Sequence, residues 1–557
     1  MRTSRRTLLS AGVLTGSALA VTAAPAAATS QRLDLRPTAA APRLPADPFT
    51  LGVASGDPAP DGFVIWTRLA PRPLDEDGLG GMPSRRYDVR WEVARDPRFR
   101  RVERRGVVTA GPESAHAVHV ELRRLDPGRA YHYRFHVDGW TSPSGRAVTT
   151  PRPDAGGGAL TMAFASCSNY PAGFFTAYRH LAEERPDVVL HLGDYQYEGA
   201  AAANPIGRPH VGPETVTLAD YRLRQALYKT DPDLQLAHAA APWLVVWDDH
   251  EVDNNYADEI PEKAVDAPTF RERRAAAYRA YYENMPLRRA SVPLGPDLQL
   301  YRRVRWGRLA TFHLLDTRQY RSDQACGDGY KDCADAADPA RSLPGTTQET
   351  WLADGFQQSD TRWDLLAQQV FFGRRDNDAG AATTVSMDSW DGYPASRDRV
   401  AAAWQDAHVR NPVVLTGDVH AHWASEIVQD WNDPTSPVIG SELVTSSITS
   451  GGDGYDEPHG VHPWAAWNPN LKFWTNLRGY VSTRITRDTL TADYRCVGTV
   501  TTPDAPVFTR RSYILEDGVR GLQLAADNPM PPSSRARRAL PGPQQIIEDT
   551  IREETGG

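Results

Sequence analysis

Side chains that can bind metal ions follow directly after five apolar runs of this chain. A lone Cys after a strand is usually part of the core, and a lone Asp after Gly usually belongs to a turn. Five such segments at equivalent positions together predict one polyvalent metal site. The segments are Ser166-Cys167-Ser168-Asn169, Gly193-Asp194-Tyr195-Gln196-Tyr197, Asp248-Asp249-His250-Glu251, Asp316-Thr317-Arg318 and Gly417-Asp418-Val419-His420-Ala421-His422.

The donor types indicate two kinds of cation. A thiolate and a phenolate beside carboxylate and imidazole favour a hard, oxidised transition metal such as Fe(III), with Zn(II) less favoured. Sites made only of oxygen ligands favour calcium or magnesium. Asp194 follows Gly193, so its carboxylate could bridge two metals, while Tyr197 three positions later could reach the first.

The apolar runs before these segments predict the elements that position them. The runs do not alternate with polar residues, and helical patterns such as 174–184 and 271–283 lie between some of them. Unbroken strands separated by helices indicate an α/β domain with a sheet buried on both faces, which binds ligands at the carboxyl ends of its strands. The runs are Leu160–Ala165, Val188–Leu192, Trp243–Trp247, Leu309–Leu315 and Val413–Leu415.

The region from 49 to 152 has a different pattern. Its strand-like runs mostly alternate apolar and polar residues, and Pro and Gly turns separate them. This pattern is typical of a small antiparallel β-sandwich of the immunoglobulin or fibronectin kind. We place the catalytic domain at 153–530 and a C-terminal tail at 531–557, in which residues 544–554 form a helix that is a candidate lid.

The N-terminal residues have the pattern of an export signal. Arg5-Arg6 precedes an apolar, glycine-spaced stretch, and Ala26-Ala27-Ala28 supplies small residues for cleavage. Residues 1–28 therefore form a predicted signal peptide of the twin-arginine type, which exports folded proteins, and 29–48 form a flexible tether. The signal predicts a secreted protein. No later segment has about 18 unbroken apolar residues, so we expect the mature protein to be soluble.

Composition limits the partners. The chain of 557 residues has a formal net charge of −8 and an ordinary apolar content of 40%. Binding to nucleic acid needs a basic face, so we expect no specific nucleic-acid binding. The excess of carboxylates suits calcium. We expect a monomer with a small-molecule or lipid substrate.

The four cysteines divide into two kinds. Cys326 and Cys333 flank a turn-rich spacer, a spacing that favours a local disulfide in an exported protein. Cys167 and Cys496 could also pair, but Cys167 follows an apolar run and is better used as a metal ligand.

Several blocks resemble those of the PhoD-type alkaline phosphatases. They occur in that family's order and span most of residues 49–500, and the family extends to some secreted phospholipases D. The blocks are 164–168, 193–198, 247–255, 315–321, 389–394 and 417–420. The resemblance implies an α/β metallophosphoesterase domain with two packed sheets and flanking helices, preceded by the small all-β domain.

The wider calcineurin-like metallophosphoesterases imply a ligand set. By that resemblance, iron binds Cys167, Asp194, Tyr197 and His420. One or two calcium ions bind Asp194, Asp249 and Asp418, while zinc or manganese is less favoured. A further His on the second metal of those relatives has no counterpart, and Asn254 is a candidate for its place.

The same resemblance implies hydrolysis of phosphate mono- and diesters by a metal-bound hydroxide or oxide. His250, beside Asp249, could protonate the leaving group or hold a phosphate oxygen. Arg318 is a candidate phosphate clamp, and Asn169 could donate a hydrogen bond to the same group.

Two alternatives remain open. A phospholipase D would use the same site on phospholipid diesters and make peripheral contact with membranes. A secreted adhesion or carbohydrate-binding protein would use the sandwich instead, but it leaves the five clusters unexplained. The segment from Gly451 to Trp474 carries Trp464 and Trp467 and could wall the site, contact lipid or belong to the core.

Overall fold

The structure is a computed structural model that describes residues 43–204, 206–531 and 541–555. Two compact units are separated after Leu44, and all elements below belong to the second, Pro45–Gly557. The predicted signal peptide, the tether up to residue 42 and the tail residues 532–540 lie outside the described residues.

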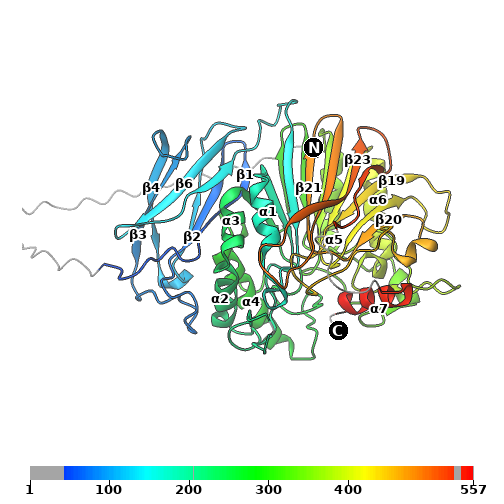
Figure 1. The fold of residues 1–557 in the computed structure, drawn as a ribbon, viewed down its shortest axis with the longest axis horizontal. Coiled ribbons are helices and arrows are strands. Elements are labelled where there is room, and N and C mark those ends of the chain that lie inside the picture. Colours follow the sequence, from blue (N-terminus) through cyan, green and yellow to red (C-terminus); the bar gives the residue numbers. More distant parts are fainter. Residues whose placement is uncertain (1–42, 205, 532–540, 556–557) are drawn as a thin grey trace, which may run out of the picture. The chain divides into compact units, whose positions relative to one another are not determined.

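A ten-stranded sheet, in which Figure 1 labels β1, β2, β21 and β23, contains three of the apolar runs as neighbouring parallel strands, β9, β10 and β11. These three strands are almost wholly buried, which explains why they carry no polar alternation. In spatial order the sheet consists of β24 (Gln523–Asp527), β23 (Val507–Glu516), β22 (Thr489–Val497), β21 (Gly479–Ile485), β9 (Leu160–Ala165), β10 (Val188–Leu192), β11 (Pro242–Val246), β1 (Val53–Ala59), β2 (Gly62–Arg68) and β5 (Ala117–Glu121).

A seven-stranded sheet carries the other two runs. Its parallel centre, β13, β15 and β17, packs against the first sheet, since Phe164 and Leu190 share one apolar core with Phe312 and Leu415. In spatial order it consists of β12 (Arg302–Trp306), β13 (Ala310–Leu314), β15 (Trp363–Gln368), β17 (Pro412–Thr416), β19 (Val438–Val444), β18 (His422–Val428) and β20 (Leu471–Thr475).

Helices cover the outer face of each sheet. Tyr178 of α1, Leu234 of α3 and Tyr278 of α4 join the core of the ten-stranded sheet, while Leu352 of α5 and Trp404 of α6 pack on the seven-stranded one. The helices are α1 (Thr176–Glu183), α2 (Leu218–Lys229), α3 (Pro232–Ala240), α4 (Ala267–Asn284), α5 (Thr346–Gln357), α6 (Pro394–Asp406) and α7 (Pro543–Glu554).

The N-terminal β region does not form a separate pair of sheets. Its strands β1, β2 and β5 extend the ten-stranded sheet, because β1 pairs in parallel with β11. The remaining strands form a five-stranded sheet of β4 (Val102–Ala110), β3 (Tyr87–Ala94), β6 (Ala130–Val137), β7 (Trp140–Thr141) and β8 (Gly145–Val148). The alternating pattern indicated the strands correctly but could not show that one layer is shared with the larger domain.

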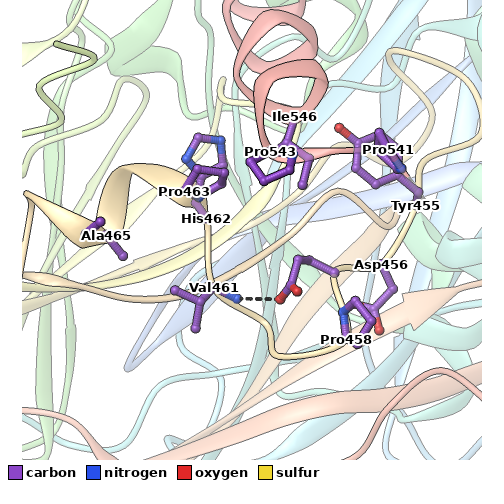
Figure 2. A pocket seen from close by; sticks show the side chains of 12 residues that line it. Tyr455, Asp456, Pro458, Val461, His462, Pro463, Ala465, Pro541, Pro543 and Ile546 are labelled. Atoms are coloured by element: carbon purple, nitrogen blue, oxygen red, sulfur yellow. Dashed lines mark hydrogen bonds between the residues drawn. The ribbon is translucent and has the colours of Figure 1, made fainter. Parts of the chain in front are cut away.

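The C-terminal helix α7 packs on the segment rich in Trp. Ile546 is buried with Trp464 and Trp474, so these two tryptophans are core residues. Beside this contact, Pro543 and Ile546 line a mostly apolar cavity of about 680 Å³ together with Tyr455 and His462 (Figure 2). Among the described helices, none is long and apolar enough for a membrane span.

Candidate metal centre

The five predicted segments meet where the carboxyl edges of the two sheets face each other. The loops after β9 and β10 are joined by a hydrogen bond from the Cys167 N–H to the Gly193 carbonyl, 3.2 Å. From the other sheet, Gly417 approaches within van der Waals distance of Leu192 and Ser166, so that a side chain at 417 would clash with both. This close packing brings the segment after β17 to those after β9 and β10.

Three groups of possible ligand atoms lie here, each with its atoms within 4.8 Å of one another. Cys167, Asp194 and His420 form one group, and Asp194, Asp249 and His250 form the second. Asp194, Asp248 and Asp418 form the third. Asp194 belongs to all three, which is the position expected for a carboxylate that bridges two cations.

Tyr197 lies against the first group. Its hydroxyl donates to Asp194 Oδ2 at 3.0 Å and lies 3.2 Å from His420 Nε2. The four residues expected to bind iron are therefore together, and Asp249 and Asp418, which are expected to bind calcium with Asp194, adjoin Asp194.

The backbone at this centre is unusual. Cys167, Asp194, Asp418 and His420 all have positive φ values, between 55° and 59°. Non-glycine residues seldom adopt this left-handed conformation, and where they do it is often at a functional site. Four candidate ligands share it, which indicates that ligand placement takes precedence over local backbone preference.

Gly193 permits the close approach of the loops that carry the carboxylates. Its φ is 104°, and a Cβ at this position would lie 2.4 Å from the Cβ of Asp248. Any side chain at 193 would therefore push apart the segments that hold Asp194 and Asp248.

The donor set fits bound cations. Asp194 Oδ1 and Asp248 Oδ2 are buried without a hydrogen-bond partner among the described residues. Burial raises the pKa of Asp194 and Asp418 well above the usual range, and neighbouring carboxylates add to it. A nearby cation would offset this desolvation and repulsion, so the residues present suit a polynuclear metal site.

Two further ligand candidates have pKa shifts that fit the same conclusion. Burial, Asp194 and Asp418 raise the pKa of the Cys167 thiol well above its usual range, so a thiolate here needs a cation. Burial and Arg478 lower the pKa of His420 to about 3, which keeps its imidazole neutral and able to ligate.

His250 lies at the edge of the centre. Its Nδ1 pairs with Glu198 Oε2 at 2.7 Å, and its ring packs on that of Tyr197 with centroids 4.1 Å apart. Burial by itself would lower the pKa of His250, but Glu198, Asp249 and Asp194 outweigh it and raise the pKa well above the usual value. The geometry fits a proton donor that is held in place by Glu198.

Arg318 is fully buried beneath the carboxylates. Its Nε donates to Asp248 Oδ1 at 2.5 Å and its Nη1 to Asp388 Oδ1 at 2.8 Å. Its Nη2 lies 3.6 Å from Asp249 Oδ2. These contacts favour a role in positioning Asp248 and Asp249 over the direct phosphate contact expected from the sequence.

The two asparagines differ. Asn169 lines a cavity of about 480 Å³ beside Tyr197 and His250, and its buried Oδ1 has no partner among the described residues. Asn254 lines the same cavity, but its side-chain amide donates to Glu262 at 2.8 Å. Asn254 is therefore turned toward a carboxylate outside the three metal-binding groups.

Three supporting residues were missed by the sequence reasoning. Asp248 belongs to one of the five predicted segments, but the sequence did not indicate it as a ligand. Glu251 accepts the backbone N–H groups of Asp194 and Tyr195, at 3.1 and 2.6 Å, and so fixes their loop. The N–H of Asn255 donates to Asp249 Oδ2 at 2.7 Å. A run of four acidic and imidazole residues, 248–251, is the signal that could have indicated the first two.

A disulfide bond closes a loop that contacts the candidate metal centre. Cys326 and Cys333 are bonded, with Sγ–Sγ 2.02 Å, while Cys167 and Cys496 are buried free thiols. The structure thus confirms the predicted local disulfide. Inside the closed loop, Asp328 accepts the side-chain amide of Asn255 at 2.6 Å.

Comparisons with known proteins agree with this geometry. Residues 162–494 match the model of the PhoD-like phosphatases, and residues 35–151 match that of the PhoD-like phosphatase N-terminal domain. Alkaline phosphatase D of Bacillus subtilis is 46% identical over 524 residues, which cover 93% of this chain and 88% of the relative. A solved structure described as "Structure of PhoD" is 45% identical with a TM-score of 0.86 and covers 93% of this chain and 99% of that chain. The resemblance and the fold class predicted from the sequence are confirmed.

Proposed function

This chain belongs to the PhoD-like phosphatase family and is a phosphoric ester hydrolase, and we propose that it hydrolyses phosphate mono- and diesters outside the cytoplasm with iron and calcium. One observation carries the proposal. The four residues expected to bind iron converge around Asp194, whose carboxylate also adjoins Asp248, Asp249 and Asp418.

The cation assignment follows from the donors. Cys167, Tyr197 and His420 with one carboxylate suit Fe(III), whereas Asp194, Asp249 and Asp418 suit calcium, and Asp248 is added to this second set. When bound, such cations neutralise the phosphate and supply the nucleophilic oxygen.

The protein itself orients the ester and moves the proton. Arg318 holds Asp248 and Asp388, and Glu251 fixes the loop of Asp194, so the carboxylates need little rearrangement as charge develops. His250, anchored by Glu198, donates a proton to the leaving alcohol. Asn169 donates its side-chain amide to the phosphoryl group from the wall of the cavity.

Secretion by the twin-arginine pathway is part of the proposal and rests on the segment 1–28. The comparisons do not favour the phospholipase or adhesion alternatives.

The test is hydrolysis of a chromogenic phosphomonoester, a small diester and phosphatidylcholine by purified protein, before and after chelator treatment. We expect activity on the first two, loss with chelator, and recovery with Fe(III) and Ca²⁺ together. Full activity after removal of all metal would contradict the proposal. A higher rate on phosphatidylcholine than on both small esters would favour the phospholipase alternative.

A further inference from the structure

The negative net charge of the chain conceals a basic region. Between Arg85 and Arg146 there are fourteen arginines against eight Asp and Glu, although the whole chain has a formal charge of −8. The densest part is the hairpin of β3 and β4, where residues 95–105 hold six arginines and two acidic residues. The rest of the chain is correspondingly more acidic.

The turn of this hairpin is fixed by its own contacts. The carboxylate of Asp96 accepts the backbone N–H groups of Arg98, Arg100 and Arg101, at 3.1, 3.3 and 2.9 Å. Phe99 is buried beneath, with the Arg134 guanidinium 4.0 Å from its ring centroid. A rigid turn therefore presents three exposed arginines within four residues.

Carboxylate partners for these arginines are lacking. Glu103 pairs with Arg95 at 2.7 Å, and Glu92 pairs with Arg134. Within the described chain, Arg98, Arg100, Arg101 and Arg105 form no ion pair. Surface arginines on an acidic protein would gain from such pairs, so a cluster left without them is available to an anion from outside.

A second loop enlarges the basic surface. Arg104 donates to the backbone carbonyl of Arg124, which places the exposed residues Arg123 and Arg124 beside the hairpin. We define the arginine surface as Arg98, Arg100, Arg101, Arg105, Arg123 and Arg124, of which Arg123 has a long ion pair with Glu121 at 3.9 Å. Its charges are distributed over two loops and a strand, an arrangement that suits an extended polyanion better than a single small ion.

We propose that the arginine surface binds a polymer of phosphodiesters. Guanidinium groups match phosphate oxygens in shape and charge, and several contacts along one chain add up. Binding at the arginine surface goes beyond the proposed function. Only the choice of phosphate groups over other repeated anionic groups rests on the proposed function.

The test measures binding and hydrolysis separately. Fluorescent oligothymidylate serves as a single-stranded phosphodiester polymer of uniform sequence. Its fluorescence anisotropy is followed with the metal-loaded protein over a range of salt concentrations. The triple variant Arg98→Ser, Arg100→Ser, Arg101→Ser is compared with Arg308→Ser, Arg484→Ser, Arg487→Ser, which removes three exposed arginines that also form no ion pair with any described residue. Activity on a small monoester is recorded for each protein.

We expect the first variant to bind the strand roughly tenfold more weakly than the wild type, or weaker still. The slope of log K against log salt concentration should fall in magnitude by about 2, because each lost arginine–phosphate contact with a single strand removes about 0.7. Its monoester activity should equal that of the wild type, and the control variant should bind normally. Equal binding by all three proteins, or an equal loss in both variants, would overturn the proposal. Failure of the small-ester assay alone would affect the proposed function and not this surface.

Other occupants give distinct results. If the surface binds a second copy of this acidic chain, the wild type will dimerise at low salt and the first variant will not, without binding to the strand. If it binds an anionic membrane, phosphatidylglycerol vesicles will retain the protein while the strand does not. Either result would overturn the assignment to a phosphodiester polymer.

Discussion

At the scale of single residues, we expect Tyr197 to give the iron-loaded centre a visible absorption band. A phenolate bound to Fe(III) absorbs visible light, and the Tyr197 hydroxyl lies within 3.2 Å of both Asp194 and His420. We expect the iron-loaded protein to be coloured and Tyr197→Phe to shift or abolish the band. The measurement is an absorption spectrum with metal analysis of the same sample.

Tyr195→Phe is the matched control for this experiment. Tyr195 is equally buried two positions away, but its hydroxyl bonds to His238 at 2.8 Å and not to the centre. The visible absorption band of the Tyr195→Phe variant should be the same as that of the wild type. A colourless, fully active wild type that contains zinc and no iron would contradict the iron assignment.

The role of His250 can be tested through the leaving group. If His250 protonates the departing alcohol, His250→Gln should lower kcat by about 10²-fold or more for alcohols of high pKa and much less for activated phenols. Glu198→Gln should show the same trend at smaller size, because Glu198 orients the ring and raises the pKa of His250 but does not itself donate the proton. An equal loss for all leaving groups would show that His250 is structural.

The residue types at the centre could be predicted from the sequence, but their division of labour could not. Cys167, Asp194 and His420 each follow an apolar run, and parallel strands bring such positions to one edge. Arg318 follows a run in the same way, yet it is committed to Asp248 and Asp388. Which polar side chain faces the cavity and which lies beneath it depends on packing between two sheets, which no local pattern encodes.

At the scale of elements, the disulfide loop contacts the segment that carries Asp249, one of the proposed calcium ligands. Asp328 within the loop holds Asn255, whose N–H holds Asp249. Replacing both Cys326 and Cys333 by Ser should lower the free energy of unfolding by about 2 kcal/mol, from the loop-closure entropy. Denaturant unfolding measures this loss.

Asp328→Asn separates the two effects, since it keeps the disulfide and weakens the carboxylate's contacts with Asn255 and with the Gly329 N–H. We expect near-normal stability and reduced calcium affinity. Peptide mapping without reductant should find the Cys326–Cys333 bridge and a free Cys167. A bridge between Cys167 and Cys496 would remove the iron ligand.

Helix α7 is linked to the centre through Arg478, and we expect it to control access there. Glu553 lies 3.3 Å from Arg478, whose guanidinium also donates to the His420 carbonyl, and Glu554 pairs with Arg375. Removal of residues after about 530 should therefore raise activity on bulky diesters more than on a small monoester. The double variant Glu553→Gln, Glu554→Gln should act in the same direction while keeping Ile546 in the core.

Glu548→Gln, on the exposed face of the same helix, is the control and should change neither rate. Equal changes of both rates in the truncated protein would show that α7 does not select between substrates. The tryptophans would not then supply the selectivity, since Trp464 and Trp474 are buried.

Some secondary-structure elements could be predicted from the sequence, whereas the pairing of others could not. Strands β9, β10, β11, β13 and β17 coincide with the apolar runs, because burial on both faces leaves an unbroken pattern. The pairing of β1 with β11 could not be foreseen. It depends on a contact between residues nearly two hundred positions apart, and strand patterns do not identify the partner strand.

At the scale of the whole molecule, a buried lysine couples stability to pH. Lys229 is 1% exposed, and its Nζ contacts Tyr195 Oη at 3.0 Å and His238 Nε2 at 3.4 Å. Trp66 covers it, and no carboxylate pairs with it among the described residues. Burial, with a smaller contribution from Arg68, lowers its pKa to about 7 from the usual value of 10.5.

This shift makes the folded protein more stable as the pH rises. Between pH 7 and the ordinary lysine pKa, the unfolded chain binds a proton at Lys229 that the folded chain does not, so this residue adds about 1.4 kcal/mol per pH unit to the free energy of unfolding. Below about pH 7 both states are protonated, and the desolvation penalty is then largest.

Lys229→Met removes the titrating group and with it this pH dependence of the free energy of unfolding. The stability advantage of the variant over the wild type should therefore be greatest near pH 7 and shrink by roughly 2 kcal/mol or more by pH 9. Urea unfolding across this range measures the difference, with Lys263→Met, at a side chain 77% exposed, as the control that should show no such trend. A stability difference that is independent of pH would mean that Lys229 stays charged in the folded protein, held by the rings of Trp66 and Tyr195.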